Sequence, residues 1–236
     1  MDLKPFQFQE FQICQSSKVF RVGTDGVLLG ALANCKDTLR VLEAGSGTGV
    51  ISLMLAQRNK IAQITAIDID INAVELSGQN FQLSPFSSRL ETKVQDFKTF
   101  RSLEKYDLIV SNPPFFLENN SEKDRVARQR VHLDFFELFQ GAKDNLSTEG
   151  RLSLIVPFES KREILDAAKN FGFFLERIVE IKGIEKGPVV RLIMEFRLFD
   201  TATEKELLTL EEQPRKYTKE YLELTRDFHV FGKKNK

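Results

Sequence analysis

Residues 39–50 read LRVLEAGSGTGV, and this stretch decides the fold that the sequence predicts. Residues 39–44 form an apolar, β-rich run typical of a buried strand, and from residue 50 to residue 58 apolar side chains recur at helical spacing. Between them lies a loop with glycines at 45, 47 and 49. Glycine lets the chain turn tightly and lets a ligand touch the backbone, and the first N–H groups of the next helix are free to bind it. The stretch therefore predicts a strand, a ligand-binding loop and a helix.

The alternation of a short apolar run and an amphipathic stretch continues along the chain. It predicts strands at residues 63–68, 90–94, 106–111 and 151–156, and helices at 72–81 (capped by Asp70), 133–146 (closed by a turn at 149–150) and 160–170. Such alternation indicates right-handed βαβ units around a parallel sheet. The last two runs, 175–181 and 189–198, are joined by too short a connection for a helix, which predicts an antiparallel hairpin. The expected fold is α/β, a doubly wound and mostly parallel sheet with a C-terminal antiparallel hairpin.

The composition is that of an ordinary globular protein. The chain has 236 residues, enough to bury a core without disulfides, and we expect one domain with a core at 39–199 between appendages at 1–38 and 200–236. Its 34 Lys and Arg balance its 34 Asp and Glu, which excludes attachment to nucleic acid by bulk positive charge. No apolar stretch approaches the ~18 residues of a membrane span, the start lacks a signal-peptide pattern, and no Cys/His cluster has zinc-ligand spacing. We expect a cytoplasmic monomer that binds neither membrane nor metal.

Two acidic residues flank the glycine loop and indicate the kind of ligand. Asp68 ends the next predicted strand, about 20 residues beyond Gly49, where a carboxylate can bind both hydroxyls of a ribose. The glycines are spaced G-x-G-x-G rather than the G-x-G-x-x-G of dinucleotide sites, and Glu43 precedes them. A carboxylate facing the ligand disfavours a pyrophosphate and favours a cation. The sequence therefore favours S-adenosylmethionine over NAD, with the candidate cofactor residues Glu43, Gly45, Ser46, Gly47, Thr48, Gly49 and Asp68.

Five further residues are candidates for the same cofactor. Asp96 follows the strand at 90–94 and is expected to accept from the adenine amino group while Phe97 packs near the ring; alternatively they are a solvated turn acid and a core residue. Before the first strand, Lys18, Thr24 and Asp25 are expected to lie over the cofactor and meet its methionine ammonium or carboxylate. Thr24 or Asp25 could instead be the N-cap of a helix that runs through residue 32.

The sequence SNPPFF at residues 111–116 follows the strand at 106–111 directly, and it is either a simple turn or a catalytic motif. Asn112 has a side-chain carbonyl acceptor and Pro113 a backbone carbonyl, so together they can hold both hydrogens of one NH2 group. That grip would aim the nitrogen lone pair at a methyl donor and stabilise the charge that develops on nitrogen. Phe115 could stack on a planar substrate, and the rigid Pro113 and Pro114 keep the arrangement preorganised.

The glycine loop, Asp68 and the Asn112–Phe115 motif resemble class I S-adenosylmethionine-dependent amino-methyltransferases. With KVFRVGTDGVLLG at residues 18–30 and the Ala-Arg pair at 127–128, the chain from about residue 6 to residue 231 resembles the tRNA1(Val) (adenine-37-N6)-methyltransferase family. The resemblance implies N6-methylation of an adenine beside a tRNA anticodon, and a Rossmann-like sheet of seven strands. The sequence departs from the family pattern by having Glu43 for an Asp and Phe115 for a frequent Tyr.

A cluster of basic residues lies just past the Asn112 motif. The candidates for binding RNA phosphates are Lys123, Arg125, Arg128 and Arg130, although such runs are often only a solvated linker. Other functions stay open. The acceptor pair would also fit a ribosomal RNA base or a protein glutamine amide, the loop would suit a dinucleotide oxidoreductase, and the fold could serve as a non-catalytic RNA-binding module.

Overall fold

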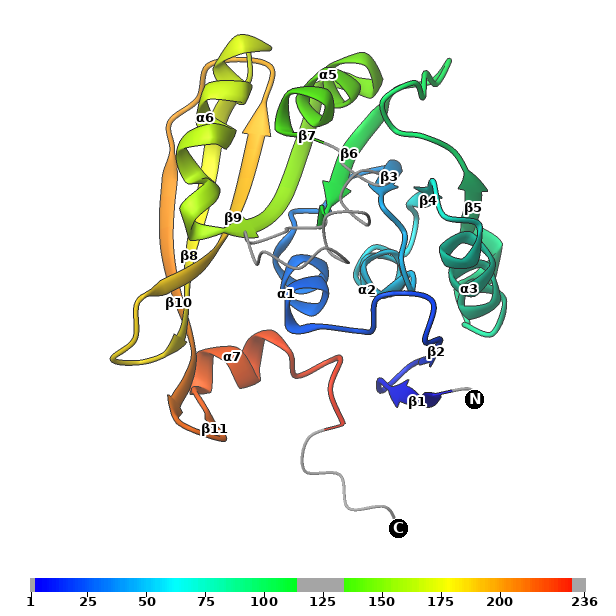
Figure 1. Ribbon diagram of the computed structural model, residues 1–236, viewed down its shortest axis with the longest axis vertical. Helices are drawn as coiled ribbons and strands as arrows, with labels where there is room; N and C mark the ends of the chain where they lie inside the picture. Colours follow the sequence, from blue (N-terminus) through cyan, green and yellow to red (C-terminus); the bar gives the residue numbers. More distant parts are fainter. Residues whose placement is uncertain (1–2, 114–133, 231–236) are drawn as a thin grey trace, which may run out of the picture.

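The computed structural model describes residues 3–113 and 134–230. Its main sheet has nine strands in the order β11-β10-β8-β9-β7-β6-β3-β4-β5, and β1 and β2 form a separate two-stranded sheet (Figure 1). The strands are β1 (Leu3–Gln7), β2 (Gln12–Gln15), β3 (Arg40–Ala44), β4 (Gln63–Asp68), β5 (Leu90–Val94), β6 (Tyr106–Ser111), β7 (Leu146–Pro157), β8 (Phe174–Ile184), β9 (Val189–Arg197), β10 (Glu204–Gln213) and β11 (Lys216–Tyr217). The helices are α1 (Thr24–Leu32), α2 (Val50–Arg58), α3 (Ile71–Gln82), α5 (Phe135–Asn145), α6 (Lys161–Asn170) and α7 (Lys219–Leu224).

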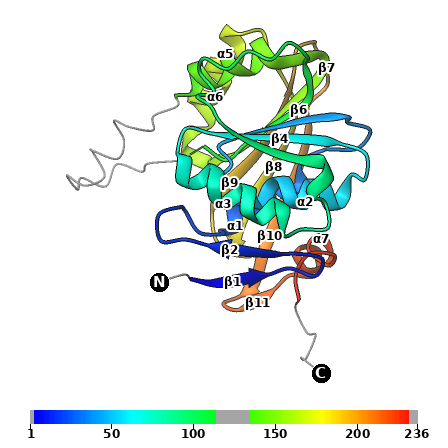
Figure 2. The same cartoon turned by 90° about the vertical axis from the view of Figure 1, so that its right-hand side faces the viewer.

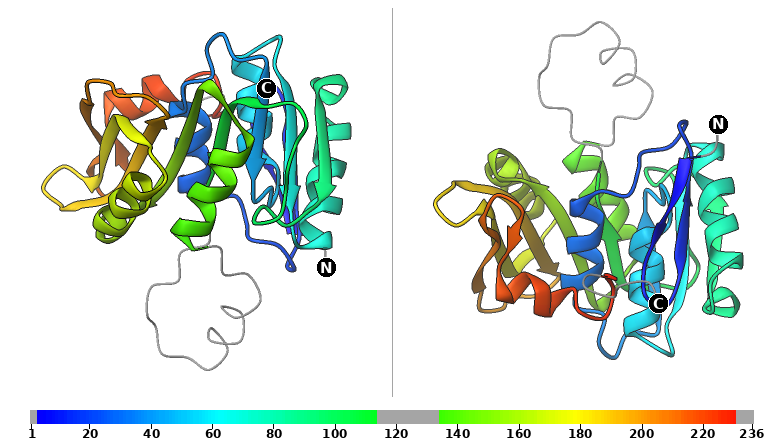
Figure 3. Two further views of the ribbon diagram at one scale, coloured as in Figure 1. Left: turned by 90° about the horizontal axis from the view of Figure 1, so that it is seen from above. Right: turned by 90° about the horizontal axis from the view of Figure 1, so that it is seen from below.

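The topology confirms the predicted doubly wound sheet. Strands β5, β4, β3, β6 and β7 are parallel, and β9 runs antiparallel between β7 and β8. Helices α5 and α6 cover one face of the sheet, and α1 and α2 cover the other (Figure 3). Asp70 caps α3 as predicted, because its side chain accepts a hydrogen bond from the backbone N–H of Asn72.

The strand β7 begins earlier than the sequence predicts. Leu146, placed at the end of a helix by its apolar periodicity, already pairs with Tyr106 of β6, and Arg151 pairs with Leu108. Between these two pairs, β7 contains residues 147–150 and β6 contains only Asp107. The predicted turn at 149–150 is therefore an irregularity within the strand. α5 ends at Asn145, so β7 follows it without a separate loop.

The C-terminal segment enlarges the sheet beyond the seven strands that the family resemblance implies. The sequence predicts that residues 200–236 follow the sheet as an appendage, but β10 pairs in parallel with β8 from Glu204 to Glu211, and β11 pairs with β10. The outer edge of β8 would otherwise carry a row of unpaired N–H and C=O groups. Pairing with β10 satisfies those groups.

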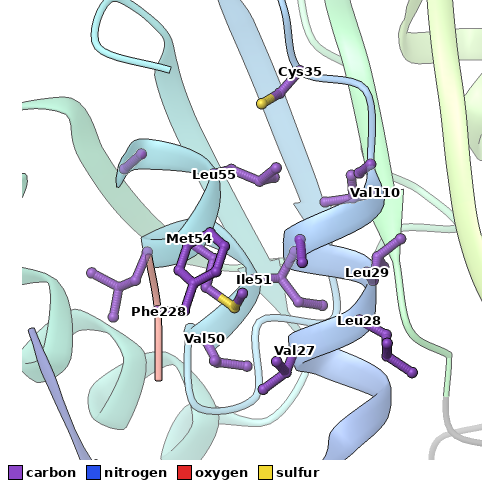
Figure 4. Close-up of a cluster of buried hydrophobic side chains, with 14 of the residues drawn as sticks. Val27, Leu28, Leu29, Cys35, Val50, Ile51, Met54, Leu55, Val110 and Phe228 are labelled. Carbon is purple, nitrogen blue, oxygen red and sulfur yellow. The ribbon is translucent and has the colours of Figure 1, made fainter. Parts of the chain in front are cut away.

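Each face of the sheet buries its own apolar cluster, because alternate residues of a strand point to opposite faces. Val41 and Val110 belong to the cluster under α1 and α2, whereas Leu42 and Ile109 belong to the cluster under α5 and α6. Figure 4 shows the first cluster, in which side chains of α1 and α2 meet and Phe228 from the C-terminal segment lies close by. This two-sided burial explains why the central strands read as continuous apolar runs.

The N-terminal hairpin of β1 and β2 lies below α3 in Figure 2, and its strand β2 contacts that helix. Phe8 forms an isolated antiparallel bridge with His229, and the Gln9 side chain donates to the His229 carbonyl at 2.7 Å. The first and last described segments are therefore hydrogen-bonded to each other, and both contribute to the cluster under α1 and α2.

A buried ion pair joins the added strand to the rest of the sheet. Glu195 of β9 is 1% exposed and accepts from the backbone N–H of Asn34 at 2.8 Å. Arg177 of β8 lies 3.4 Å from the Glu195 carboxylate and 2.6 Å from that of Glu206 on β10. Arg177 also donates to the carbonyl of Leu32 at the end of α1. One guanidinium thus links α1, β8, β9 and β10.

We predict that Arg177→Met lowers the free energy of unfolding by about 3–5 kcal/mol, because it leaves the buried Glu195 carboxylate without its counter-charge. Urea denaturation measures the loss. Arg226→Met is the control, since Arg226 pairs with Glu223 where both side chains are 65% exposed, and such a pair contributes less than about 1 kcal/mol. Equal losses in the two variants would contradict the assignment.

Candidate functional site

The register of three parallel strands brings the predicted motifs to one edge of the sheet. Ala44, the last residue of β3, pairs with Ile67 of β4 and with Ser111 of β6. Hydrogen bonds continue beyond the strands, because the N–H groups of Gly45 and Ser46 donate to the Ile67 carbonyl at 2.9 and 3.0 Å. The Ser111 hydroxyl donates to the Ala44 carbonyl at 2.8 Å. The glycine loop, Asp68 and Asn112 therefore leave adjacent strands at the same edge.

The three glycines of the loop have positive φ angles, but they serve two purposes. A Cβ added to Gly45 (φ 87°) or Gly47 (φ 49°) would meet no atom of the described residues within 4 Å. A Cβ added to Gly49 (φ 78°) would lie only 2.5 Å from the Phe81 ring. Gly49 therefore permits close packing against α3, whereas Gly45 and Gly47 leave bare backbone on the side where a ligand can approach.

Both carboxylate oxygens of Asp68 accept backbone hydrogen bonds, and one of these bonds comes from the glycine loop. One oxygen accepts from the Gly47 N–H at 3.1 Å and the other from the Asp70 N–H at 3.0 Å. Burial raises the pKa of Asp68, while the hydrogen bonds from Asp70 and Gly47 oppose that shift. Each oxygen keeps a second acceptor position. This arrangement suits a carboxylate that binds two neighbouring hydroxyl groups.

Glu43 does not face the ligand side of the loop as the sequence interpretation assumed. The side chain is 1% exposed, and its carboxyl accepts from the backbone N–H of Ser52 at 3.1 Å and from the Ser52 hydroxyl. The first turn of a helix has N–H groups that need acceptors, so the carboxyl turns into α2. Burial raises the pKa of Glu43 to about 8, although the Ser52 hydrogen bonds lower it. Glu43 therefore does not present a negative charge to a cationic ligand.

The residues after β5 divide between the edge and the core. Asp96 is half-buried, and its side chain accepts from the Lys98 N–H at 2.9 Å. The N–H of the preceding Gln95 donates to the Asp68 carbonyl at 2.9 Å, which places Asp96 beside that acid. Phe97 is 6% exposed within the cluster under α5 and α6, where Gly141 gives it room. The structure therefore favours the alternative in which Phe97 is a core residue, rather than one that packs beside an adenine ring.

The residues before β3 lie at the start of α1. Gly23 is the N-cap residue of that helix and no side chain caps it, so the alternative N-cap role of Thr24 or Asp25 is wrong. Asp25 instead pairs with Arg191 of β9, with 2.9 Å between Nε and Oδ2. Nothing in the sequence indicated Arg191, since no local pattern links it to Asp25, which lies far away in the chain. Lys18 is exposed, and Thr24 begins the helix.

Asn112 is half-buried and Pro113 is buried directly after β6. Within the described part of the chain, the Asn112 side-chain amide makes no hydrogen bond. The other residues that the sequence analysis singled out here lie outside the described residues; they are Pro114, Phe115, Lys123, Arg125, Arg128 and Arg130.

Over residues 3–113 and 134–230, no three or more His, Cys, Asp or Glu side chains are grouped so that they could hold a metal ion. In the same part of the chain, every helix is too short or too polar to cross a bilayer.

We predict that Glu43→Gln changes how stability depends on pH. The pKa of Glu43 rises from 4.5 to about 8 on folding, so its protonated carboxyl contributes stability below the lower value and loses that contribution as the pH rises through the higher one. Glutamine stays neutral. Urea denaturation between about pH 5 and pH 9 should therefore show wild-type stability falling relative to the variant.

Glu176→Gln is the matched control for this titration. Burial alone would raise the pKa of Glu176, but hydrogen bonds and charge from Arg151 and Arg197 outweigh it and lower that pKa. This carboxylate is therefore ionised throughout the tested range, and its removal should shift the stability without changing its slope with pH. A parallel slope for Glu43→Gln would show that Glu43 is ionised in the native protein.

Comparison with known proteins places the chain in a family. The family model "Methyltransferase small domain" matches residues 12–173. A tRNA1(Val) (adenine(37)-N6)-methyltransferase from Flavobacteriaceae bacterium (strain 3519-10) is 44% identical over 97% of this chain and 100% of its own length. A protein of the same name from Christiangramia forsetii is 40% identical over 98% of this chain and 99% of its own length. Another from Aliivibrio fischeri is 38% identical over 96% of this chain and 98% of its own length.

Solved structures agree with the fold. A predicted O-methyltransferase from Agrobacterium tumefaciens has a TM-score of 0.66 and 20% identity, over 86% of this chain and 96% of that one. A putative RNA methyltransferase from Pyrococcus horikoshii has a TM-score of 0.52 and 20% identity, over 73% and 80% of the two chains. The chain belongs to the methyltransferase small domain family and to the family of tRNA1(Val) (adenine(37)-N6)-methyltransferases.

Proposed function

We propose that this protein transfers a methyl group from S-adenosylmethionine to the N6 amino group of an adenine in tRNA, namely adenine 37 of tRNA1(Val). The observation that carries the proposal is the placement of Asn112 and Pro113 beside the glycine loop, through the pairing of Ser111 with Ala44. The names of relatives that are 38–44% identical over nearly the whole chain support the substrate.

The residues at the sheet edge fit S-adenosylmethionine. The bare backbone of Gly45 and Gly47 leaves room for the cofactor to lie against the loop. Asp68 would accept from the two ribose hydroxyls, and Asp96 from the adenine amino group. When bound, the cofactor supplies a methyl group on a positively charged sulfur. Glu43 would not contact the cofactor; its hydrogen bond to Ser52 would connect the start of the loop to the first turn of α2.

Asn112 and Pro113 would orient the substrate amine. The amide oxygen of Asn112 and the backbone carbonyl of Pro113 accept its two hydrogens, so the nitrogen lone pair turns out of the purine plane. Positive charge develops on that nitrogen during attack, and two fixed carbonyl dipoles stabilise it. Holding the amine in line also supplies part of the rate. Phe115 would stack on the base, which is turned out of a partly unstacked anticodon loop.

Basic residues that follow the Asn112 motif in the sequence would hold the tRNA. Lys123, Arg125, Arg128 and Arg130 would bind tRNA phosphates next to the target base. We propose that the protein acts in the cytoplasm as a monomer and without a metal ion. The N–C bond would form as the S–C bond of the methyl donor breaks, leaving S-adenosylhomocysteine, and the surplus proton of the amine would pass to water, so that neither a metal nor a general base is needed. Residues 1–38 would cover the cofactor as part of a single domain over residues 1–236.

We predict that Asn112→Ala lowers the rate of N6-methyladenine formation by about 10²–10³, the usual effect of removing one preorganised group that faces developing charge. Purified protein is incubated with S-adenosylmethionine and unmodified tRNA, and nucleosides are measured by mass spectrometry. Asn170→Ala, at the far end of α6, is the control and should keep wild-type activity. An Asn112→Ala variant with an undiminished rate would contradict the proposed role.

A charge reversal separates RNA from a protein glutamine as the substrate. Arg125→Glu combined with Arg128→Glu should raise the KM for tRNA about tenfold or more, because several phosphate contacts are lost and repulsion replaces them. The affinity for S-adenosylmethionine should not change. If methylation of tRNA is unaffected by the double reversal, the positive cluster does not bind this substrate, and the glutamine alternative gains support.

A further inference from the structure

One face of α3 supports the glycine loop from behind. Three of its side chains, spaced so that they share one side of the helix, contact three consecutive parts of the loop. They are Ser77, Asn80 and Phe81, and they contact Ser46, Thr48 and Gly49 respectively. The Ser77 contact is a hydroxyl–hydroxyl hydrogen bond of 3.2 Å, and the Phe81 contact is van der Waals packing.

Asn80 makes the central contact and satisfies its whole amide with backbone groups. It is 0% exposed. Its Nδ2 donates to the Thr48 carbonyl at 2.9 Å and to the Cys14 carbonyl at 3.1 Å, and its Oδ1 accepts from the Cys14 N–H at 2.8 Å. A single side chain on α3 therefore ties the glycine loop to β2 of the N-terminal hairpin.

Among the described residues, no atom lies within 4 Å of a Cβ built on Gly45 or Gly47. No side chain of the described part of the chain therefore packs against the loop at these two positions. Glycine residues are also costly to order, since glycine loses more backbone freedom on folding than any other residue. Contacts from behind must therefore fix the loop before a ligand arrives.

We propose that Asn80 is a positioning residue for the cofactor, which holds the Thr48 carbonyl so that the glycine loop is already in its binding conformation without ligand. This inference rests on the proposed function, because it takes the loop to be the S-adenosylmethionine site. Asn80 does not touch the reacting atoms. Its contribution should therefore be seen in cofactor affinity and not in the rate at saturating cofactor.

The chain contains a matched control in Asn59. This residue is also buried, at 8% exposure, and its Nδ2 donates to the carbonyls of Cys35 and Thr38, both at 2.8 Å. Its Oδ1 accepts from backbone N–H groups. Asn59 follows the C-terminal end of α2, whereas the glycine loop precedes the N-terminal end. Replacing either asparagine by aspartate removes donated hydrogen bonds to two backbone carbonyls, and Asn59 also loses a 3.2 Å bond to the Thr38 hydroxyl.

Calorimetry with S-adenosylhomocysteine on the full chain tests the proposal. Asn80→Asp should raise the Kd at least tenfold, and Asn59→Asp less than twofold. With tRNA as substrate, Asn80→Asp should raise the KM for S-adenosylmethionine and leave kcat within about twofold of wild type. Hydrogen–deuterium exchange of the peptide over residues 45–49, without ligand, should speed up only in Asn80→Asp.

Several outcomes would overturn the inference. An unchanged Kd in folded Asn80→Asp, or equal changes in both variants, would show that Asn80 has only a general structural role. If wild-type protein does not bind S-adenosylhomocysteine, the proposed function fails first and the inference with it. If Asn80→Asp does not fold, Asn80→Ser, which adds no charge and is too short to span both partners, is measured instead, with the same tenfold expectation.

Discussion

The parallel register of β3 with β4 and β6 is the constraint on which the rest of the site depends. Backbone hydrogen bonds set Ala44 opposite both Ile67 and Ser111, so the residues that follow these strands emerge side by side. The ladder continues into the glycine loop through the Ile67 carbonyl and into β6 through the Ser111 hydroxyl. The loop, Asp68 and Asn112 are therefore positioned by main-chain geometry at the carboxyl ends of the strands.

The glycine loop is open on one side and supported on the other. Its open side consists of backbone that a ligand can approach, while Asn80 and Phe81 of α3 contact it from behind. Glu43 of β3, just before the loop, binds Ser52 of α2, just after it. Burial raises the pKa of the Glu43 carboxyl to about 8. The hydrogen bonds of Glu43 to Ser52 in the first turn of α2 are therefore made at the expense of desolvating this carboxyl. Polar groups within the core thus order a loop that lacks side-chain packing of its own.

The ends of the chain complete the structure around this centre. The strand β10 covers the edge of β8, and Arg177 links it to the buried Glu195. The sequence did not predict β10, because residues 204–213 read EKELLTLEEQ and lack the continuous apolar run of a central strand. As a strand near the edge with most residues partly exposed, it tolerates that many charges. The hairpin of β1 and β2 is likewise held by long-range contacts, to Asn80 and to the segment around His229.

The sequence by itself determined the central strands and helices, the glycine loop between β3 and α2, the cap at Asp70, and the sheet edge shared by Asp68 and Asn112. These features depend on apolar periodicity and on residues that lie close together in the chain. Only the tertiary structure decided that Glu43 turns into α2, that Phe97 packs in the core, that Asp25 pairs with Arg191, and that Asn80 holds the loop. Acids and amides carry no local pattern that names their partners, because each partner is set by how distant segments pack together.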